Sequence, residues 1–217
     1  MSESIFGFDT DRQWDYENGF YLTSHITRLA KMLAHYELYK SVTHLPGHIV
    51  ECGASLIRFS TFREILENPY SRKIIGFDAF GKFPEQDGAI DQEFVEKLEE
   101  AGGCGISMDE LKKVFALKSF QNYEFIQGDI LDTVPKYTSE HPELKIALLH
   151  IDVDVYKPSA TILNHLLDKV VKGGLVVFDD YGTVAGETRA IDEYFSGRNV
   201  LIEKLSISHI PSYVRMK

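Results

Sequence analysis

The sequence predicts an α/β fold built on a mostly parallel β-sheet with helices on both faces. Apolar runs that resemble strands alternate with helical patterns, a crossover helix that begins near Pro158 joins two of these runs, and carboxylates follow both of them. Strands that are buried on both faces of a parallel sheet read as continuous apolar runs, and βαβ units join them through helices. The alternation along this chain follows that pattern.

Five apolar runs are expected to form the parallel strands. They lie at residues 48–53, 73–78, 123–127, 145–152 and 175–179. A helix is expected after the first run, up to about residue 68, and the crossover helix lies between the fourth and fifth runs. The segments 200–207 and 210–216 are separated by too little sequence for a crossover, so they should form an antiparallel hairpin at the C-terminal end.

Residues 1–45 are expected to form a helical extension. Apolar residues recur with helical spacing from Leu22 through Ile26 and Leu33 to Tyr36, which is typical of an amphipathic helix. Such a helix would cover the core or form a lid.

A second helical region is expected at residues 79–118, a long connection between two strands. It contains an acidic helical piece near residues 91–100 and a second helix opened by Ser107, with Glu110 three residues later as in a capping box. We expect this insertion to lie near the active site, within a single domain formed by residues 1–217.

Composition favours a small-molecule enzyme. The chain has 33 acidic and 23 basic residues, a net charge of −10, which argues against nucleic acid as a partner. No apolar run approaches the roughly 20 residues of a membrane span, so we expect no membrane partner and a cytoplasmic location. The two cysteines, Cys52 and Cys104, are too few for a disulfide scaffold.

Four carboxylates follow the last two parallel strands. Asp152 and Asp154 come after the fourth run, and Asp179 and Asp180 end the fifth. Two carboxylates about 4 Å apart repel by roughly 4 kcal/mol at an effective dielectric constant of 20. Protonation, a basic partner or a divalent cation would relieve this repulsion, and oxygen ligands favour Mg²⁺ or another hard cation. The alternative is that these residues only end a strand or begin a turn.

Further residues at strand ends are candidates for binding a nucleoside. Gly53 would let a ligand approach the backbone, but the Gly-x-Gly-x-x-Gly fingerprint of dinucleotide sites does not follow it. Asp78 can accept hydrogen bonds from ribose hydroxyls, and Asp129 is placed to reach an adenine edge. Each is also a common turn residue. The expected cofactor-binding set is Glu51, Gly53, Ser55, Asp78, Asp129 and Asp152.

Several separated motifs resemble those of one enzyme family. Residues 77–84 read FDAFGKFP and resemble Phe-Asp-Ser-Phe-x-Gly-Leu-Pro, and residues 132–135 resemble Asp-Thr-Leu-Pro. Residues 150–156 resemble Asp-Gly-Asp-(Leu or Met)-Tyr and are followed by Asp-Asp-Tyr-Gly at 179–182. These motifs are similar to those of the macrocin O-methyltransferases, metal-dependent S-adenosylmethionine enzymes that methylate sugar hydroxyls. The resemblance extends from about residue 46 to the C-terminus.

The resemblance implies a class I methyltransferase fold, with a Rossmann-like sheet of about seven strands. It also implies that Glu51, Gly53 and Asp78 hold S-adenosylmethionine. The Mg²⁺ ligands that it implies are Asp154, Asp179 and Asp180. The chain departs from the family at residues 57–60, which read IRFS where a Gly-Gly-Ser is usual. Either Arg58 points away from the donor or the donor pocket is altered.

The expected reaction is methylation of a hydroxyl on a sugar or another vicinal diol. Asp154 is the first candidate for the base that removes the hydroxyl proton, and His209 and His150 are the reserve candidates. Two alternatives remain open: a metal-dependent phosphohydrolase that uses the same acids, and a non-catalytic binding relative. A homo-oligomer is compatible with the sequence.

Overall fold

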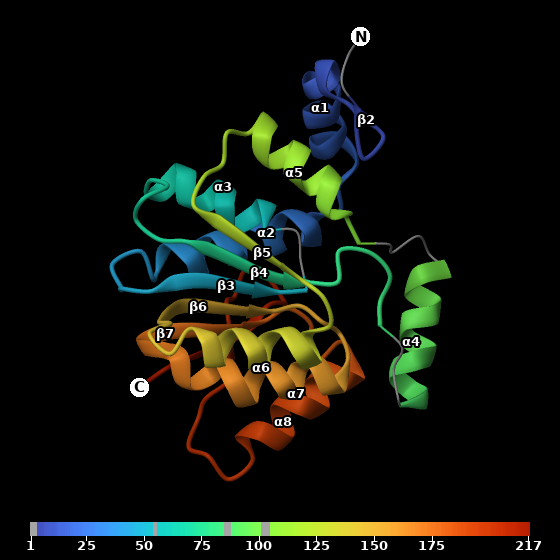
Figure 1. Cartoon of the computed structure of the whole chain (residues 1–217). Coiled ribbons are helices and arrows are strands. Elements are labelled where there is room, and N and C mark those ends of the chain that lie inside the picture. The colour runs from blue at the N-terminus through green and yellow to red at the C-terminus, as the bar shows by residue number, and fades with distance from the viewer. Residues whose placement is uncertain (1–3, 54–55, 85–87, 101–104) are drawn as a thin grey trace.

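The computed structural model describes residues 4–53, 56–84, 88–100 and 105–217, and a seven-stranded sheet forms its centre (Figure 1). The strands are β3 (His48–Cys52), β4 (Ile74–Asp78), β5 (Tyr123–Gln127), β6 (Ile146–Ile151), β7 (Val170–Phe178), β8 (Glu203–Lys204) and β9 (Ser212–Arg215). Their order is β5-β4-β3-β6-β7-β9-β8. The first five in this order are parallel, and β9 runs antiparallel to both neighbours. The expected mixed sheet with an antiparallel C-terminal pair is confirmed.

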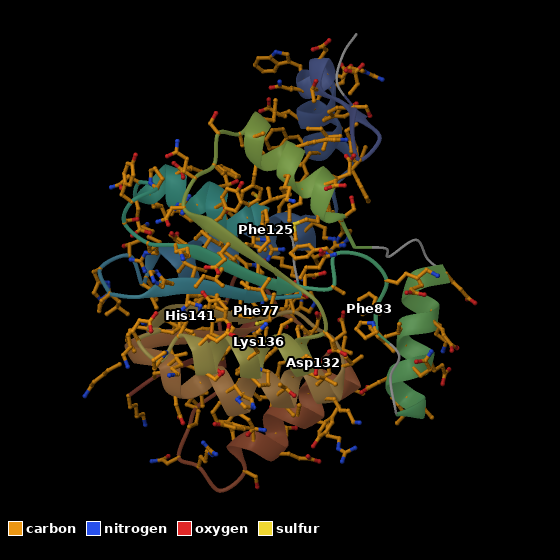
Figure 2. All side chains as sticks on the ribbon, viewed as in Figure 1. Phe77, Phe83, Phe125, Asp132, Lys136 and His141 are labelled. Atoms are coloured by element: carbon orange, nitrogen blue, oxygen red, sulfur yellow. The ribbon has the colours of Figure 1, made fainter. Side chains whose placement is uncertain are left out.

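Helices cover both faces of the sheet (Figure 1). One face carries α2 (Ile26–Lys40), α3 (Ile57–Leu66) and α5 (Met108–Leu117), and the other carries α6 (Ile130–Glu140), α7 (Tyr156–Leu166) and α8 (Ala185–Phe195). Successive strand residues point to opposite faces, so Ile49 joins the core under α2 while Val50 joins the core under α6. Figure 2 shows the same division for Phe125 and Phe77. Both faces are therefore buried, as the apolar runs predict.

The smaller elements lie at the N-terminus and around the helices. They are β1 (Ser4–Ile5), β2 (Phe8–Asp9), η1 (Thr10–Arg12), α1 (Gln13–Thr23), α4 (Ala89–Glu100) and η2 (Leu167–Lys169). Helix α7 ends at Leu166, and the chain turns through η2 into β7, which begins at Val170 and not at residue 175 as the apolar run predicts. Across the described residues, no helix has both the length and the apolar character needed to cross a bilayer.

The N-terminal region differs from the single amphipathic helix that its apolar spacing predicts. The chain forms two helices, and the His25 side chain caps the second by accepting from the backbone N–H of Thr27. Leu22 and Ile26 are 83% and 70% exposed, and the buried face of α2 is formed by other residues, among them Ala34 and Leu38. Packing against α3 and the sheet decides which stripe of α2 is buried, so the first apolar residues face solvent.

Helix α4 lies beyond the carboxyl ends of the parallel strands and apart from the helical layers (Figure 1). The carboxylate of Asp91 ties it to the main body by accepting a hydrogen bond from the backbone N–H of Tyr156, 2.9 Å away, at the start of α7. The Ser107 cap of α5 is confirmed, since its hydroxyl accepts from the Glu110 N–H. The Glu110 carboxylate instead accepts from the Phe6 N–H, so the capping box is only half formed.

A buried arginine, Arg72, stabilises the loop between α2 and β3. Arg72 pairs with Glu67 at 2.9 Å, and both side chains are almost fully buried. The same guanidinium donates to the carbonyl oxygens of Thr43, Leu45 and Gly47. Because these loop carbonyls are removed from water, Arg72 supplies the hydrogen bonds that water would otherwise give.

Replacing Arg72 with methionine should lower the free energy of unfolding by about 3–5 kcal/mol, the cost of leaving one partner of a buried ion pair alone. Urea unfolding followed by circular dichroism measures this change. Arg12→Met removes an exposed ion pair with Asp15 and is the matched control, for which we expect a much smaller effect. Equal effects of the two substitutions would contradict this role for Arg72.

Candidate active site

Neighbouring strands bring the four predicted aspartates to one edge of the sheet. Ile151 pairs with Phe178 in the β6–β7 ladder, so the residues that follow them emerge side by side. Carboxylate oxygens of Asp152, Asp179 and Asp180 lie within 4.8 Å of one another. The clustering that the sequence predicts from the strand ends is therefore present.

Asp154 stands at the start of the turn into α7, in an unusual backbone conformation. Its φ angle is +64°, a left-handed conformation that aspartate tolerates better than most residues and that often occurs at functional sites. Its carboxyl group is hydrogen-bonded to that of Asp180. Burial and the neighbouring carboxylates raise the pKa of Asp154 to about 7. Asp154 can therefore exchange a proton close to neutral pH.

Asp179 is held by three basic side chains. Lys31 forms an ion pair with Oδ2, while His35 Nε2 and His150 Nε2 lie 2.9 and 3.3 Å from Oδ1. Burial alone would raise the pKa of Asp179, but its contacts with the two imidazoles and the charge of Lys31 outweigh burial, and the pKa falls. Asp179 is therefore a carboxylate at neutral pH.

Lys31 and His35 are absent from the site residues that the sequence predicts. Both come from α2, whose sequence indicates only an extension or lid. One signal was available: His35 lies between Ala34 and Leu38 on the buried stripe of α2, with Lys31 one turn earlier. A polar residue on the buried face of a helix needs a buried partner, and Asp179 is that partner.

Glu51 lies at the end of β3, next to this network. It is 1% exposed, its Oε1 is 3.7 Å from His150 Nδ1, and its Oε2 has no partner among the described residues. Burial raises the pKa of Glu51 to about 7, against the opposing charge of Arg58. The charge of Arg58 also acts on His35 and His150, so the guanidinium faces the ends of the strands.

A cavity of about 340 Å³ opens beside the carboxylates. Its walls come from the ends of β3 to β6 and from the segments 79–84 and 105–111. Five predicted site residues line it: Gly53, Asp78, Asp129, Asp152 and Asp154. Aromatic and aliphatic side chains complete the walls, including Phe83, which lies between the sheet and α4 (Figure 2). The cavity is thus apolar with a few carboxylates, the usual character of a small-molecule site.

Asp78 and Asp129 also stabilise the local backbone. Oδ1 of Asp78 accepts from the Phe80 N–H at 2.5 Å, and Oδ1 of Asp129 caps α6 by accepting from the Leu131 N–H at 2.9 Å. The turn and cap roles that the sequence left as alternatives are therefore present. Each carboxylate has a second oxygen and lines the cavity, so these roles are compatible with ligand binding. Burial raises the pKa of Asp78.

The remaining predicted residues are placed differently. Gly53 has a φ angle of +79°, and a side chain there would collide with the carbonyl oxygen of Asp152, so close packing of two strand ends requires this glycine. Ser55 lies outside the described residues. His209 is exposed in the loop between β8 and β9, and the imidazoles that contact Asp179 are those of His35 and His150.

Comparison with known proteins identifies the family. The family model of the macrocin O-methyltransferases (TylF) matches residues 26–215. The chain belongs to this family. The resemblance of its motifs to the family is thereby confirmed.

Two curated relatives act on natural products. They are the 8-demethyl-8-(2,3-dimethoxy-alpha-L-rhamnosyl)-tetracenomycin-C 4'-O-methyltransferase of Streptomyces olivaceus, 25% identical over 146 residues, and the demethyldecarbamoylnovobiocin O-methyltransferase of Streptomyces niveus, 25% identical over 178 residues. The alignments cover 63% and 76% of this chain and 54% and 64% of those proteins. The chain thus spans between about half and two thirds of the length of these relatives.

The solved structures of two methyltransferases are similar to the fold of this chain. The calicheamicin methyltransferase CalS11 matches with a TM-score of 0.69 and 25% identity, covering 93% of this chain and 84% of its own. The O-methyltransferase NovP matches with a TM-score of 0.72 and 22% identity, covering 87% and 80%. The fold is that of the class I, S-adenosylmethionine-dependent methyltransferases.

The buried Glu51 should make stability depend on pH in a defined direction. The folded protein keeps a proton on Glu51 up to about pH 7, whereas the unfolded chain releases it near pH 4.5, so this contribution is complete below pH 4.5 and is lost as the pH rises through 7. His150, with its pKa lowered to about 4, acts in the opposite direction between pH 4 and 6.5. The comparison between wild type and Glu51→Gln isolates Glu51.

We expect wild type to lose about 3 kcal/mol of stability, relative to Glu51→Gln, between pH 4.5 and 8. Urea unfolding in the presence of a chelator measures the difference, and Glu203→Gln on the exposed strand β8 is the control. Parallel pH profiles for wild type and Glu51→Gln would show that Glu51 is not a protonated buried acid.

Proposed function

We propose that the protein is an S-adenosylmethionine-dependent O-methyltransferase that methylates a hydroxyl of a sugar or another vicinal diol with the help of a divalent cation. The observation that carries this proposal is the cavity that opens beside the carboxylates at the ends of β6 and β7. Family membership supplies the reaction class. The cavity and the acids supply the chemistry that the reaction requires.

The donor side of the site is supported by the cavity walls at β3 to β5. Asp78 would accept hydrogen bonds from the ribose hydroxyls, and Asp129 would face the adenine edge. Gly53 leaves the backbone open at the end of β3. Next to Gly53, Glu51 Oε2 and the Arg58 guanidinium are buried polar groups with unpartnered atoms, and they would pair with the polar amino acid tail of the donor.

The acids suit a hard divalent cation. Asp152, Asp179 and Asp180 offer only oxygen ligands within a small volume, and Asp154 adjoins Asp180. Asp154, Asp179 and Asp180 would hold the ion, with Asp152 beside them. The bound ion would lower the pKa of a coordinated hydroxyl and fix its position.

Asp154 is the proposed base. Methyl transfer from a sulfonium needs no help for the leaving group, so the protein must align the acceptor oxygen and remove its proton. Asp154 both lines the cavity and adjoins Asp180, so its carboxylate would lie beside the proposed ion and the acceptor hydroxyl. His209 is a weaker candidate because it is exposed in the loop that precedes β9.

The acceptor is proposed to be a sugar. The relatives' names include a rhamnosyl compound, and a second structure of CalS11, 26% identical, is described as a TDP-rhamnose 3'-O-methyltransferase. Helix α4 lies at the carboxyl edge of the sheet and is tied to α7, two residues after Asp154. The 79–118 insertion would cover the acceptor there. Residues 1–45 contribute Lys31 and His35 to the site instead of acting only as a lid.

Donor binding should depend on Asp78. Calorimetry with S-adenosylmethionine should show binding to wild type, and Asp78→Ala should weaken it by about 10-fold to 100-fold, because hydrogen bonds to a charged group are lost. Asp168→Ala, at an exposed position remote from the cavity, should bind like wild type. Absence of binding to wild type at millimolar donor would refute the proposed function.

Catalysis should depend on Asp154 and on Mg²⁺. With TDP-rhamnose as the acceptor, mass spectrometry should detect a methylated product only when Mg²⁺ is present, and Asp154→Asn should lower the rate by at least about 100-fold. The same substitution should change donor affinity far less than Asp78→Ala does. Full activity in the presence of a chelator would remove the metal from the mechanism.

A further inference from the structure

Two imidazoles and one carboxylate converge beneath the acidic cluster. His35 Nε2 lies 2.9 Å from Asp179 Oδ1 and 3.2 Å from His150 Nε2, and His150 Nε2 lies 3.3 Å from the same carboxylate oxygen. Both imidazoles are fully buried and the carboxylate is 2% exposed. Three atoms that can each present an electron pair therefore form a closed triangle without water access.

Neutral side chains cannot satisfy this triangle. His35 Nδ1 lies 2.8 Å from the carbonyl oxygen of Lys31, so the acceptor it faces assigns the ring hydrogen to Nδ1. The Nε2 atom of a neutral His35 then directs a lone pair at the Asp179 carboxylate. His150 Nε2 can donate a hydrogen to His35 Nε2 or to Asp179 Oδ1. In either case no hydrogen lies between His35 Nε2 and Asp179 Oδ1. The triangle needs a further positive centre, either a proton or a metal ion.

The spacing of the triangle matches the coordination sphere of a first-row metal ion. Ligands at about 2.0–2.1 Å from such an ion stand about 2.9–3.4 Å apart for octahedral to tetrahedral angles. The three separations in the triangle, from 2.9 to 3.3 Å, fall within this range. Two imidazoles and one carboxylate on one face of an ion are a known ligand set for Fe²⁺ and Zn²⁺.

One of the two imidazoles, that of His35, makes the outer contact that metal-binding histidines usually make. The second nitrogen of a ligand histidine commonly donates to a backbone carbonyl or a carboxylate, which fixes the ring. His35 Nδ1 faces the Lys31 carbonyl oxygen at 2.8 Å, whereas His150 Nδ1 lies 3.7 Å from Glu51 Oε1, too far for a hydrogen bond, and has no partner among the described residues. Phe59 packs edge-on against both imidazoles. The rings are therefore held in place before any ion binds.

Carboxyl groups are concentrated around the triangle. Carboxylates around Asp179 outnumber the basic side chains that the described residues place there, Lys31 and Arg58. The carboxylates are those of Glu51, Asp152, Asp154, Asp180 and Glu187. A cation in the triangle would favour the ionised form of these carboxyl groups and would be stabilised by it.

We infer that His35, His150 and Asp179 form a second, buried metal site that binds a divalent first-row transition ion such as Zn²⁺ or Fe²⁺. This site is distinct from the oxygen-only Mg²⁺ site proposed above, although Asp179 would contribute Oδ1 to the transition ion. An ion here would fix α2 to the ends of β6 and β7. Through its bond to Oδ1, the ion would also fix the position of the Asp179 carboxylate.

Cobalt titration of the full chain tests this inference. Purified protein, stripped with a chelator and supplied with excess Mg²⁺, should bind a single equivalent of Co²⁺ and show visible absorption bands of a nitrogen-coordinated ion. Elemental analysis of protein prepared without chelator should find a transition ion in the same ratio. In wild type, proton NMR of the cobalt form should show strongly shifted, exchangeable ring N–H signals from imidazole ligands.

Variants assign the ligands. His35→Gln and His150→Gln should each weaken Co²⁺ binding by at least about 100-fold, whereas His165→Gln, at an exposed position on α7, should bind like wild type. Asp154→Asn should leave the cobalt spectrum unchanged, because it alters only the Mg²⁺ ligands. Wild type that binds no Co²⁺ or Zn²⁺, or binding unaffected by both glutamine variants, would overturn the inference and leave a proton at the centre of the triangle. Donor binding, measured separately, would be unaffected by that outcome.

Discussion

Compensation of buried negative charge at the carboxyl edge of the sheet is the constraint on which this structure depends. Parallel pairing of β6 with β7 forces Asp152 and Asp179 to emerge side by side. The fold answers with Lys31 and His35 from α2 and with His150 from β6 itself. At Asp154 burial and the neighbouring carboxylates outweigh the charge of Lys31, and the pKa rises to about 7.

The two helical layers contribute unequally to this site. The layer with α2 and α3 supplies the basic side chains, while α8 on the opposite face supplies Glu187, whose carboxylate accepts from the Asp180 N–H. One layer thus sets the charge of the cluster, and the other orients its backbone. The cavity lies beside this arrangement, lined by Asp152 and Asp154 on one side and by segments 79–84 and 105–111 on the other.

The sequence predicts the sheet well because its signals are local. The runs that became β5 and β4 have the expected bounds within one residue, and the aspartates at the strand ends follow directly from parallel pairing. Lys31 and His35 could not be assigned to the site in this way. Their role depends on how α2 packs against the sheet, and the spacing of Leu22 and Ile26 indicates a different buried stripe. Long-range packing, which periodicity does not encode, decided the difference.

The link between Asp91 and the first turn of α7 has a consequence for how this fold diversifies. Asp91, from the 79–118 segment, accepts a hydrogen bond from the Tyr156 backbone N–H, while Asp179 is held by separate contacts with Lys31 and His35 of α2. On the proposed function, replacement of the outer segment would change which acceptors fit while leaving the contacts of Asp179 with α2 intact. Substrate range and chemistry could then diverge separately during evolution.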